Sequence, residues 1–122
     1  MDTNWIERLF SEPDLQRMGH GQTAADLNLG LGWLYYAQAR TLRPTRAVCI
    51  GSWRGFVPLL LAKALQDNGD GGRVTFIDPS LVDDFWTDPL RVRQWWARFG
   101  IDNIEHHHVT TLGLAEFDDL AI

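Results

Sequence analysis

Two glycines and one aspartate follow short apolar runs, in positions that a parallel sheet would bring to one edge. Gly51 comes directly after an apolar run and begins a turn that ends at Gly55, and Asp78 ends the next apolar run. A glycine lets the backbone turn sharply and lets a ligand approach closely. The helix that follows presents free amides and a positive dipole end, and a carboxylate at the next strand end can accept hydrogen bonds from ribose hydroxyls. The pattern predicts a nucleotide-type site.

Two common phosphate-binding fingerprints are absent from the turn. The sequence contains no G-x-G-x-x-G, so it lacks the fingerprint of nicotinamide dinucleotide sites, and no G-x-x-x-x-G-K-[ST], which excludes a P-loop. A G-x-x-x-G turn with a following acid remains. It leaves two interpretations open: a ligand site at the edge of the sheet, or a turn that only shapes an α/β domain.

Apolar runs and helix signals alternate along the chain. Asp88 followed by Pro89 is a strong helix start, and Asn68-Gly69 is a typical helix end. Alternation of this kind predicts an α/β fold, a Rossmann-like parallel sheet of about three strands with flanking helices. We expect strands over 46–50, 73–77 and 104–109, and helices over 24–40, 56–68, 89–99 and 111–117.

Length and composition limit the possible classes of protein. The chain has 122 residues, of which 45% are hydrophobic and 22% charged, as expected of one globular domain. We divide it into an N-terminal helical lead-in, 1–22, and a half-domain, 23–122. A net charge of −5 argues against a nucleic-acid partner, and no apolar run is long enough to cross a membrane. A single cysteine and the absence of a signal peptide predict a cytoplasmic protein.

The segments around the turn resemble class I S-adenosylmethionine-dependent methyltransferases. AVCIGSWRGFVPLLLAKAL and RVTFIDPS are similar to the first two motifs of that family, in the small-molecule O-methyltransferase-like branch, and the resemblance runs from about 18 to 117. It implies that S-adenosylmethionine is the cofactor and that Asp78 holds its ribose hydroxyls. The residues that it implies at the cofactor are Gly51, Ser52, Trp53, Gly55, Asp78 and Pro79, with Gln22 as a weaker candidate.

The sequence departs from the family pattern in two positions and in its number of strands. Cys49 stands where the family usually has an acid, and Trp53 stands where it has its middle glycine. The family sheet has seven strands, so the resemblance implies that this chain is the amino-terminal, cofactor-binding half of a methyltransferase acting on oxygen or nitrogen of a small molecule. Catalytic residues, and any ligands for a divalent metal, would then lie in the other half.

The first predicted strand would have no partner on its outer side. An unpaired apolar edge invites pairing, so we expect a second copy of the chain, or the missing half, to bind there. Two other functions stay open. The chain could be a non-catalytic Rossmann-like assembly module or, with less support, a fragment of a nucleotide-cofactor oxidoreductase.

Four further groups of residues could suggest chemistry, and we favour a structural interpretation of each. His106 and His108 would share one strand face and could share a metal, but no third ligand is near, so we expect solvated histidines. Cys49 lies inside an apolar run and is expected to be buried. We expect 91–98 to form an arginine face over packed aromatic residues. Asp83, Asp84 and Asp88 are expected to solvate a loop and cap a helix.

Overall fold

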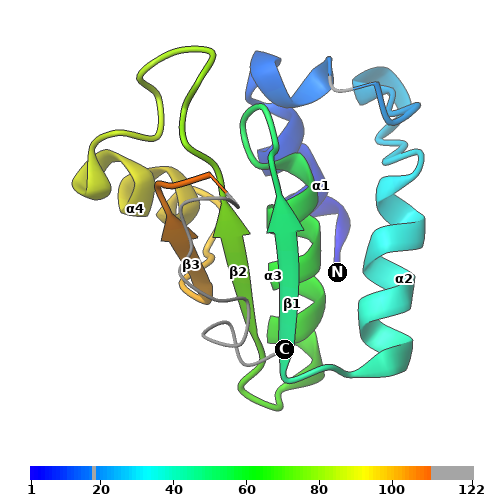
Figure 1. The fold of residues 1–122 in the computed structure, drawn as a ribbon. Coiled ribbons are helices and arrows are strands. Elements are labelled where there is room, and N and C mark those ends of the chain that lie inside the picture. The colour runs from blue at the N-terminus through cyan, green and yellow to red at the C-terminus, as the bar shows by residue number, and fades with distance from the viewer. Residues whose placement is uncertain (18, 111–122) are drawn as a thin grey trace.

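Three parallel strands form the sheet that positions the glycine turn. The computed structural model describes residues 1–17 and 19–110. Its strands are β1 (Arg46–Ile50), β2 (Arg73–Ile77) and β3 (Ile104–His107), and they lie in the order β1-β2-β3 (Figure 1). The helices are α1 (Thr3–Phe10), α2 (Gly32–Leu42), α3 (Phe56–Asn68) and α4 (Pro89–Ala97), with 3-10 turns at Pro13–Gln16 and Ala24–Asp26. The predicted α/β class with a parallel sheet is confirmed.

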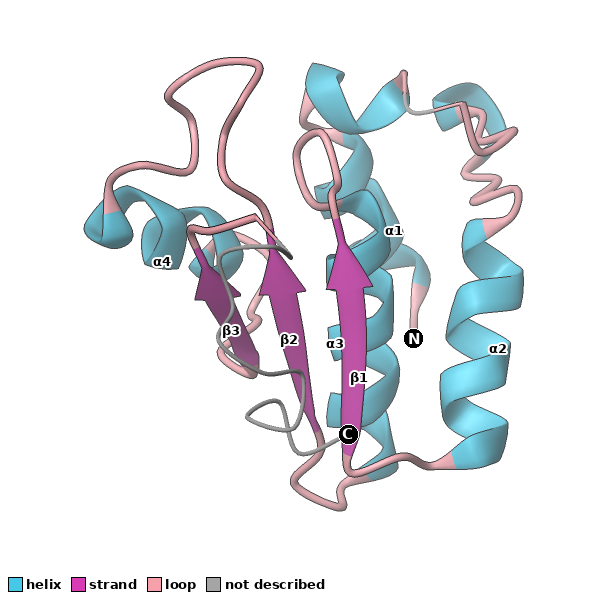
Figure 2. Cartoon of the chain, viewed as in Figure 1, coloured by secondary structure: helices cyan, strands magenta, loops and turns pink. Residues whose placement is uncertain are grey.

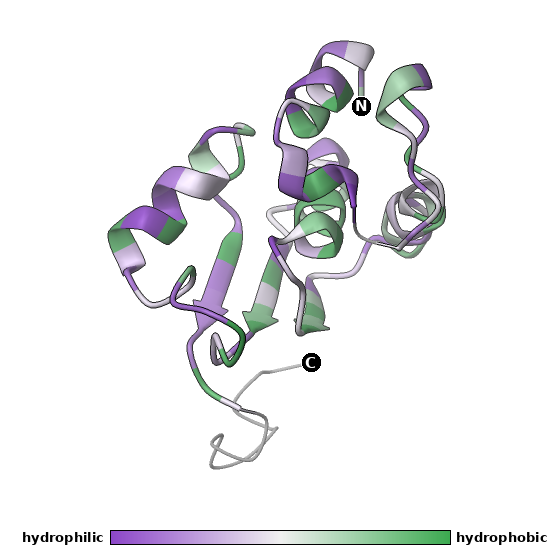
Figure 3. Cartoon of the chain, turned by 90° about the horizontal axis from the view of Figure 1, so that it is seen from above, coloured by the Kyte–Doolittle hydropathy of each residue, from purple (hydrophilic) through white to green (hydrophobic). Residues whose placement is uncertain are grey.

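Both crossover helices lie on the same face of the sheet. The strands step in one direction from β1 to β3, and right-handed crossovers then place α3 and α4 on one side (Figure 3). The other face, turned toward the viewer in Figure 2, carries no described helix. Arg46 lies on that face and donates a hydrogen bond of 2.8 Å to Thr75 Oγ1. The described helices therefore lie on one side of the sheet.

Helix α3 is the centre of the core because it is covered on several sides. It packs on β1 and β2 and also along α2. Gly32 is required at this helix contact, because a Cβ there would lie 2.5 Å from Leu60 Cδ1. Burial of a leucine side chain contributes about 1.5–3 kcal/mol to folding, so this helix is a major source of stability. Its buried residues are Phe56, Pro58, Leu59, Leu60, Ala62, Ala64 and Leu65.

The predicted helix over 24–40 is wrong in its first part, since α2 begins only at Gly32. Thr23 does not cap a helix with its side chain but forms a two-way backbone bridge with Asn28. Leu27 has φ 55° and Gly30 has φ 57°, so the chain turns back there instead of continuing as a helix. A Cβ on Gly30 would lie 2.3 Å from the carbonyl oxygen of His20, which explains the glycine.

The other boundaries agree closely with the sequence. Strands β1 and β2 and helix α3 have the predicted ends. Strand β3 ends at His107, two residues short of the prediction, and α4 ends at Ala97. The helix predicted over 111–117 lies outside the described residues. No described helix is both long enough and apolar enough to cross a membrane.

The N-terminal segment contains one helix whose position the sequence pattern could have given. Asp2 caps α1 by accepting a hydrogen bond of 3.0 Å from the amide of Trp5. Trp5 and Leu9 recur at helical spacing and are buried, and the indole Nε1 of Trp5 donates to the carbonyl oxygen of Phe99 at 2.7 Å. Helix α1 therefore docks on the segment that follows α4.

Candidate ligand-binding site

Two adjoining clefts lie at the carboxyl ends of β1 and β2. The first, here the turn cleft, has a volume of about 320 Å³, and the second, the edge cleft, about 310 Å³. Gly51, Asp78 and Val82 line both. The turn cleft is also lined by Ser52, Trp53, Arg54, Ser80, Asp83 and Trp86, and the edge cleft by Ile50, Ile77, Pro79, Leu81, Val109 and Thr110.

Gly51 holds the backbone at the junction of the two clefts. Its φ is 70°, in the left-handed region that side chains other than glycine rarely adopt. Its amide continues the ladder of β1 by donating to the carbonyl oxygen of Ile77 at 2.9 Å. Apart from its two chain neighbours, no atom of the described residues lies within 4 Å of the position that a Cβ would take. The backbone of Gly51 is thus open to close approach by a ligand.

Asp78 connects the turn to the loop after β2. Its Oδ1 accepts a hydrogen bond from the amide of Ser80 at 2.8 Å, and its Oδ2 accepts one from the amide of Ser52 at 3.3 Å. The carboxylate is half-buried. Because an ionised carboxylate has about four acceptor positions, two remain for hydroxyl groups of a ligand. The predicted juxtaposition of the turn with this acid is present in the structure.

Ser52 contributes a polar atom without a partner. Its Oγ is buried and makes no hydrogen bond with the described residues. Leaving a buried hydroxyl unsatisfied costs about 1–3 kcal/mol. Such groups in a native structure often mark a place where a ligand or water completes the site.

Arg54 organises the turn, and the sequence analysis missed this residue. Its side chain is 9% exposed and lies between the rings of Trp53 and Phe85, with its Cζ atom 3.9 and 4.1 Å from the ring centroids. It forms ion pairs with Asp83 at 2.6 Å and Asp14 at 3.4 Å. The hydrogen bond from Arg54 holds the pKa of Asp83 below its usual range. The arginine in the glycine turn was the available signal, but its partner lies far along the chain.

Asp83 therefore differs from the prediction made for the acidic cluster. We expected it to solvate a loop, and instead it pairs with a buried guanidinium. Asp88 does cap α4, because its Oδ1 accepts from the amide of Leu90 at 3.0 Å. The cluster therefore divides into one ion-pairing acid, one helix cap and Asp84, which is exposed in the loop as expected.

Gly55 lies in the turn but lines neither cleft. Its φ is 93°, and a Cβ there would come within 2.5 Å of Trp96 Cζ3. The indole Nε1 of Trp95 donates to the carbonyl oxygen of Arg54 at 2.8 Å, so both tryptophans of α4 hold the turn. The contacts assign Gly55 to packing of the turn against α4. Trp95 is itself buried.

The remaining candidates divide between the clefts and other parts of the fold. Trp53 is 42% exposed and lines the turn cleft, while Pro79 lines the edge cleft. Gln22 lines neither cleft; its amide donates to the carbonyl oxygen of Leu15 and accepts from the amide of His20. The structure thus brings together Gly51, Ser52, Trp53, Asp78 and Pro79.

Cys49 is a buried structural residue, as expected. Burial raises the pKa of its thiol to about 12, and the nearby charge of Asp78 acts in the same direction. A thiol of that pKa is protonated at neutral pH, so it does not act as a nucleophile there. Its Sγ lies 3.7 Å from the carbonyl oxygen of Gly51, and the residue lines neither cleft.

His106 and His108 lie on one side of the chain and His107 on the other, as predicted, but the ring of His106 is half-buried. Its ring stacks on Phe76 with centroids 5.1 Å apart, and its Nε2 lies 3.0 Å from the carbonyl oxygen of Asp78. His107 is on the other face, where it pairs with Glu105. The expectation of solvated histidines is wrong for His106 because Phe76 and Trp86 offer it an aromatic wall. Within 1–17 and 19–110, no three His, Cys, Asp or Glu side chains are placed to hold a metal.

Folding stability should fall as the pH drops from about 7.5 to 5.5. Burial lowers the pKa of His106 and of His20 below 6.5. As the pH falls, these two histidines take up protons in the unfolded chain before they do so in the folded chain. The stability that depends on their neutral form is therefore complete above pH 6.5, and it is lost as the pH falls toward their pKa values in the folded chain. The slope is at most about 1.4 kcal/mol per pH unit for each histidine.

Urea unfolding at the two pH values measures this effect. His106→Phe keeps a ring on Phe76 and should reduce the difference between the two pH values. Asp67 and Asp83 do not interfere, because their lowered pKa values place their effect at more acid pH. Equal stability of the wild type at both pH values would contradict the prediction.

Comparison with known proteins identifies no relative. No family model, no curated protein and no solved structure matches the chain. The geometry of the two clefts is therefore the basis for a functional proposal.

Proposed function

We propose that the chain binds S-adenosylmethionine at the turn and edge clefts, as the cofactor-binding part of a class I methyltransferase acting on oxygen or nitrogen of a small molecule. The observation that carries this proposal is the placement of Gly51 and Asp78 at the junction of the clefts, where each lines both. An open glycine backbone beside a half-buried carboxylate suits a ligand with a ribose.

The strand order supports a ligand at this place. Seen from the far edge, the order β3-β2-β1 corresponds to one half of a doubly wound Rossmann sheet, which runs 3-2-1-4-5-6. Ligands of such sheets bind outside the carboxyl ends of the strands, where the order reverses, and this point is next to β1. Both clefts lie there. The sheet face without a described helix is the one that a second half would cover in such a fold.

The residues at the clefts fit the cofactor. Asp78 retains acceptor positions for the two ribose hydroxyls. The open backbone at Gly51 and the unpartnered hydroxyl of Ser52 suit the amino-acid end, which carries both donors and acceptors. Pro79, in the edge cleft, offers a flat apolar surface for the adenine. When bound, the cofactor supplies an activated methyl group; the chain fixes its position for transfer.

The two departures from the family pattern change the site without closing it. The neutral Cys49 thiol offers no charge where the family usually has an acid. Trp53 stands where the family has a glycine. Its ring stacks on Arg54 and adds an aromatic surface to the wall of the turn cleft. We expect Cys49 and Trp53 to change the affinity for S-adenosylmethionine more than the place where it binds.

Calorimetric titration with S-adenosylhomocysteine tests the proposal. We expect saturable binding at one site per chain, and weaker binding of adenosine, which lacks the amino-acid end. Absence of heat up to millimolar ligand, with a chain shown to be folded by circular dichroism, would contradict cofactor binding by this chain.

A second candidate, the assembly module, is favoured by the edge of β1. Among the described residues no strand pairs with its outer side, and Ile50 is 59% exposed. An unpaired apolar edge is a surface for strand addition. Light scattering after size-exclusion chromatography distinguishes the two cases. A stable dimer without any response to S-adenosylhomocysteine favours the assembly module, and a monomer that binds the ligand favours the cofactor site.

A further inference from the structure

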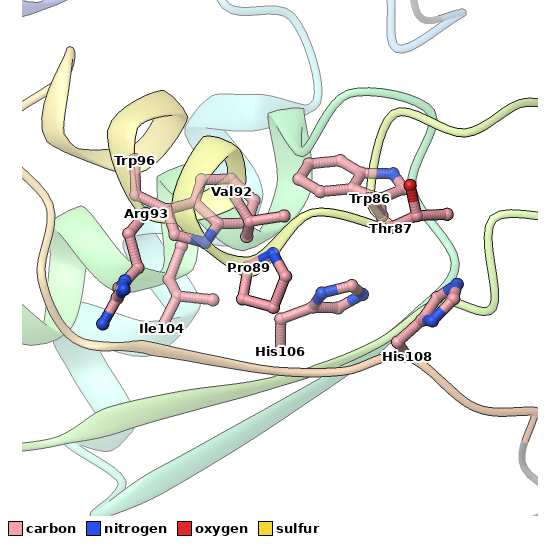
Figure 4. A pocket seen from close by; sticks show the side chains of 9 residues that line it. All are labelled: Trp86, Thr87, Pro89, Val92, Arg93, Trp96, Ile104, His106 and His108. Atoms are coloured by element: carbon pink, nitrogen blue, oxygen red, sulfur yellow. The ribbon is translucent and has the colours of Figure 1, made fainter.

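A third cavity, of about 390 Å³, lies between α4 and β3 and is separate from the two clefts (Figure 4). Trp86 forms part of its wall and also part of the wall of the turn cleft, but neither Gly51 nor Asp78 lines it. Its volume is within the range of small-molecule sites. We call it the α4–β3 pocket.

A buried donor without a partner faces this pocket. Trp96 is 3% exposed, and its indole Nε1 makes no hydrogen bond with the residues that the structure describes. In Figure 4 this nitrogen lies on the pocket side of the ring, between the side chains of Arg93 and Pro89. By contrast, the buried indoles of Trp5 and Trp95 each donate a hydrogen bond to a backbone carbonyl oxygen. An acceptor from a ligand would satisfy Trp96.

The charge at the pocket is suited to an anion. Arg93 is exposed on the rim, and no ion pair or hydrogen bond joins its guanidinium to another described residue. None of the described lining residues is acidic, although the chain has a net charge of −5. The Nε2 of His106 must donate to the carbonyl oxygen of Asp78, because a carbonyl only accepts. None of the described lining side chains carries a negative charge.

Part of the remaining wall is apolar. Trp86, Val92 and Ile104 line the interior with an indole and two branched side chains. Aromatic surfaces and branched aliphatic side chains favour a planar hydrophobic group beside them. A metal ion is disfavoured by the presence of only two imidazoles, and an organic cation by Arg93.

We propose that the α4–β3 pocket binds a small aromatic carboxylate. The carboxylate accepts hydrogen bonds from the Trp96 indole and the Arg93 guanidinium, and the aromatic ring lies against Trp86, Val92 and Ile104. The α4–β3 pocket is separate from the cofactor site, so this proposal does not depend on whether the chain binds S-adenosylmethionine.

Titration of the ¹⁵N-labelled chain with benzoate tests this site, with benzamide as the neutral control of the same shape. The indole resonance of Trp96, assigned with Trp96→Phe, is expected to move downfield and saturate with benzoate. Benzamide should bind at least about tenfold more weakly, because hydrogen bonds to charged groups are stronger than neutral ones.

Arg93→Gln should weaken benzoate binding about tenfold without unfolding the chain, because Arg93 is exposed. Arg73→Gln removes the same charge outside this pocket and should leave binding unchanged. Saturable shifts whose affinity falls about tenfold with Arg93→Gln alone support the proposal. It is overturned if the Trp96 indole does not respond, if benzamide binds as well as benzoate, or if both arginine variants behave alike.

Discussion

Replacing Gly55 with alanine is expected to lower the free energy of unfolding by about 2–4 kcal/mol. Alanine at φ 93° is strained by about 1 kcal/mol or more. Its Cβ would also lie 2.5 Å from Trp96 Cζ3, and overpacking of this kind typically costs about 1–3 kcal/mol. Urea unfolding followed by circular dichroism measures the loss.

Gly69→Ala is the matched control for this prediction. Gly69 also has a positive φ, 72°, but beyond its chain neighbours no atom in the described part of the chain lies within 4 Å of the position of a Cβ there. It should lose only the conformational part, about 1 kcal/mol. If the two variants were destabilised equally, the contact of Gly55 with Trp96 would have no energetic role.

Replacing Asp78 with asparagine is expected to weaken binding of S-adenosylhomocysteine by about 10- to 100-fold. The change removes the negative charge that strengthens hydrogen bonds from the ribose hydroxyls, each worth about 1.5–3 kcal/mol when the acceptor is ionised. An amide oxygen can still accept from the amide of Ser80, so the loop after β2 should stay in place. Calorimetric titration gives the affinities.

Asp84→Asn provides the control for the loss of charge. Asp84 is exposed in the loop before α4 and lines neither cleft, so its variant should bind the ligand as the wild type does. Wild-type affinity in the Asp78 variant would place the ribose elsewhere. Equal losses in both variants would indicate an effect of net charge only.

The parts of the fold that sequence reasoning predicted depend on short-range signals. Strands β1 and β2 end where apolar runs meet Gly51 and Asp78, and α3 begins after Gly55. Parallel strands then bring Gly51 and Asp78 to one edge, so the main pair of the candidate site followed from the order of elements alone.

The parts that were missed depend on contacts between distant segments. Helix α2 begins late because the backbone turns at Gly30, close to the carbonyl oxygen of His20. Helical periodicity does not encode such a contact. Arg54 is fixed by Asp83, across a separation of 29 residues, and the half-buried ring of His106 stacks on Phe76. The close contact of Gly55 with Trp96 also depends on the packing of α4 against the turn, which local sequence signals do not encode.

The central claim is that S-adenosylmethionine binds at the junction of Gly51 and Asp78, and mapping of amide shifts tests it most directly. We would titrate the ¹⁵N-labelled chain with S-adenosylhomocysteine and follow the backbone amides. The proposal predicts the largest saturable shifts at Gly51, Ser52, Asp78 and Ser80, with little change at the Trp96 indole. Saturable shifts concentrated away from the two clefts, or none at millimolar ligand, would contradict it.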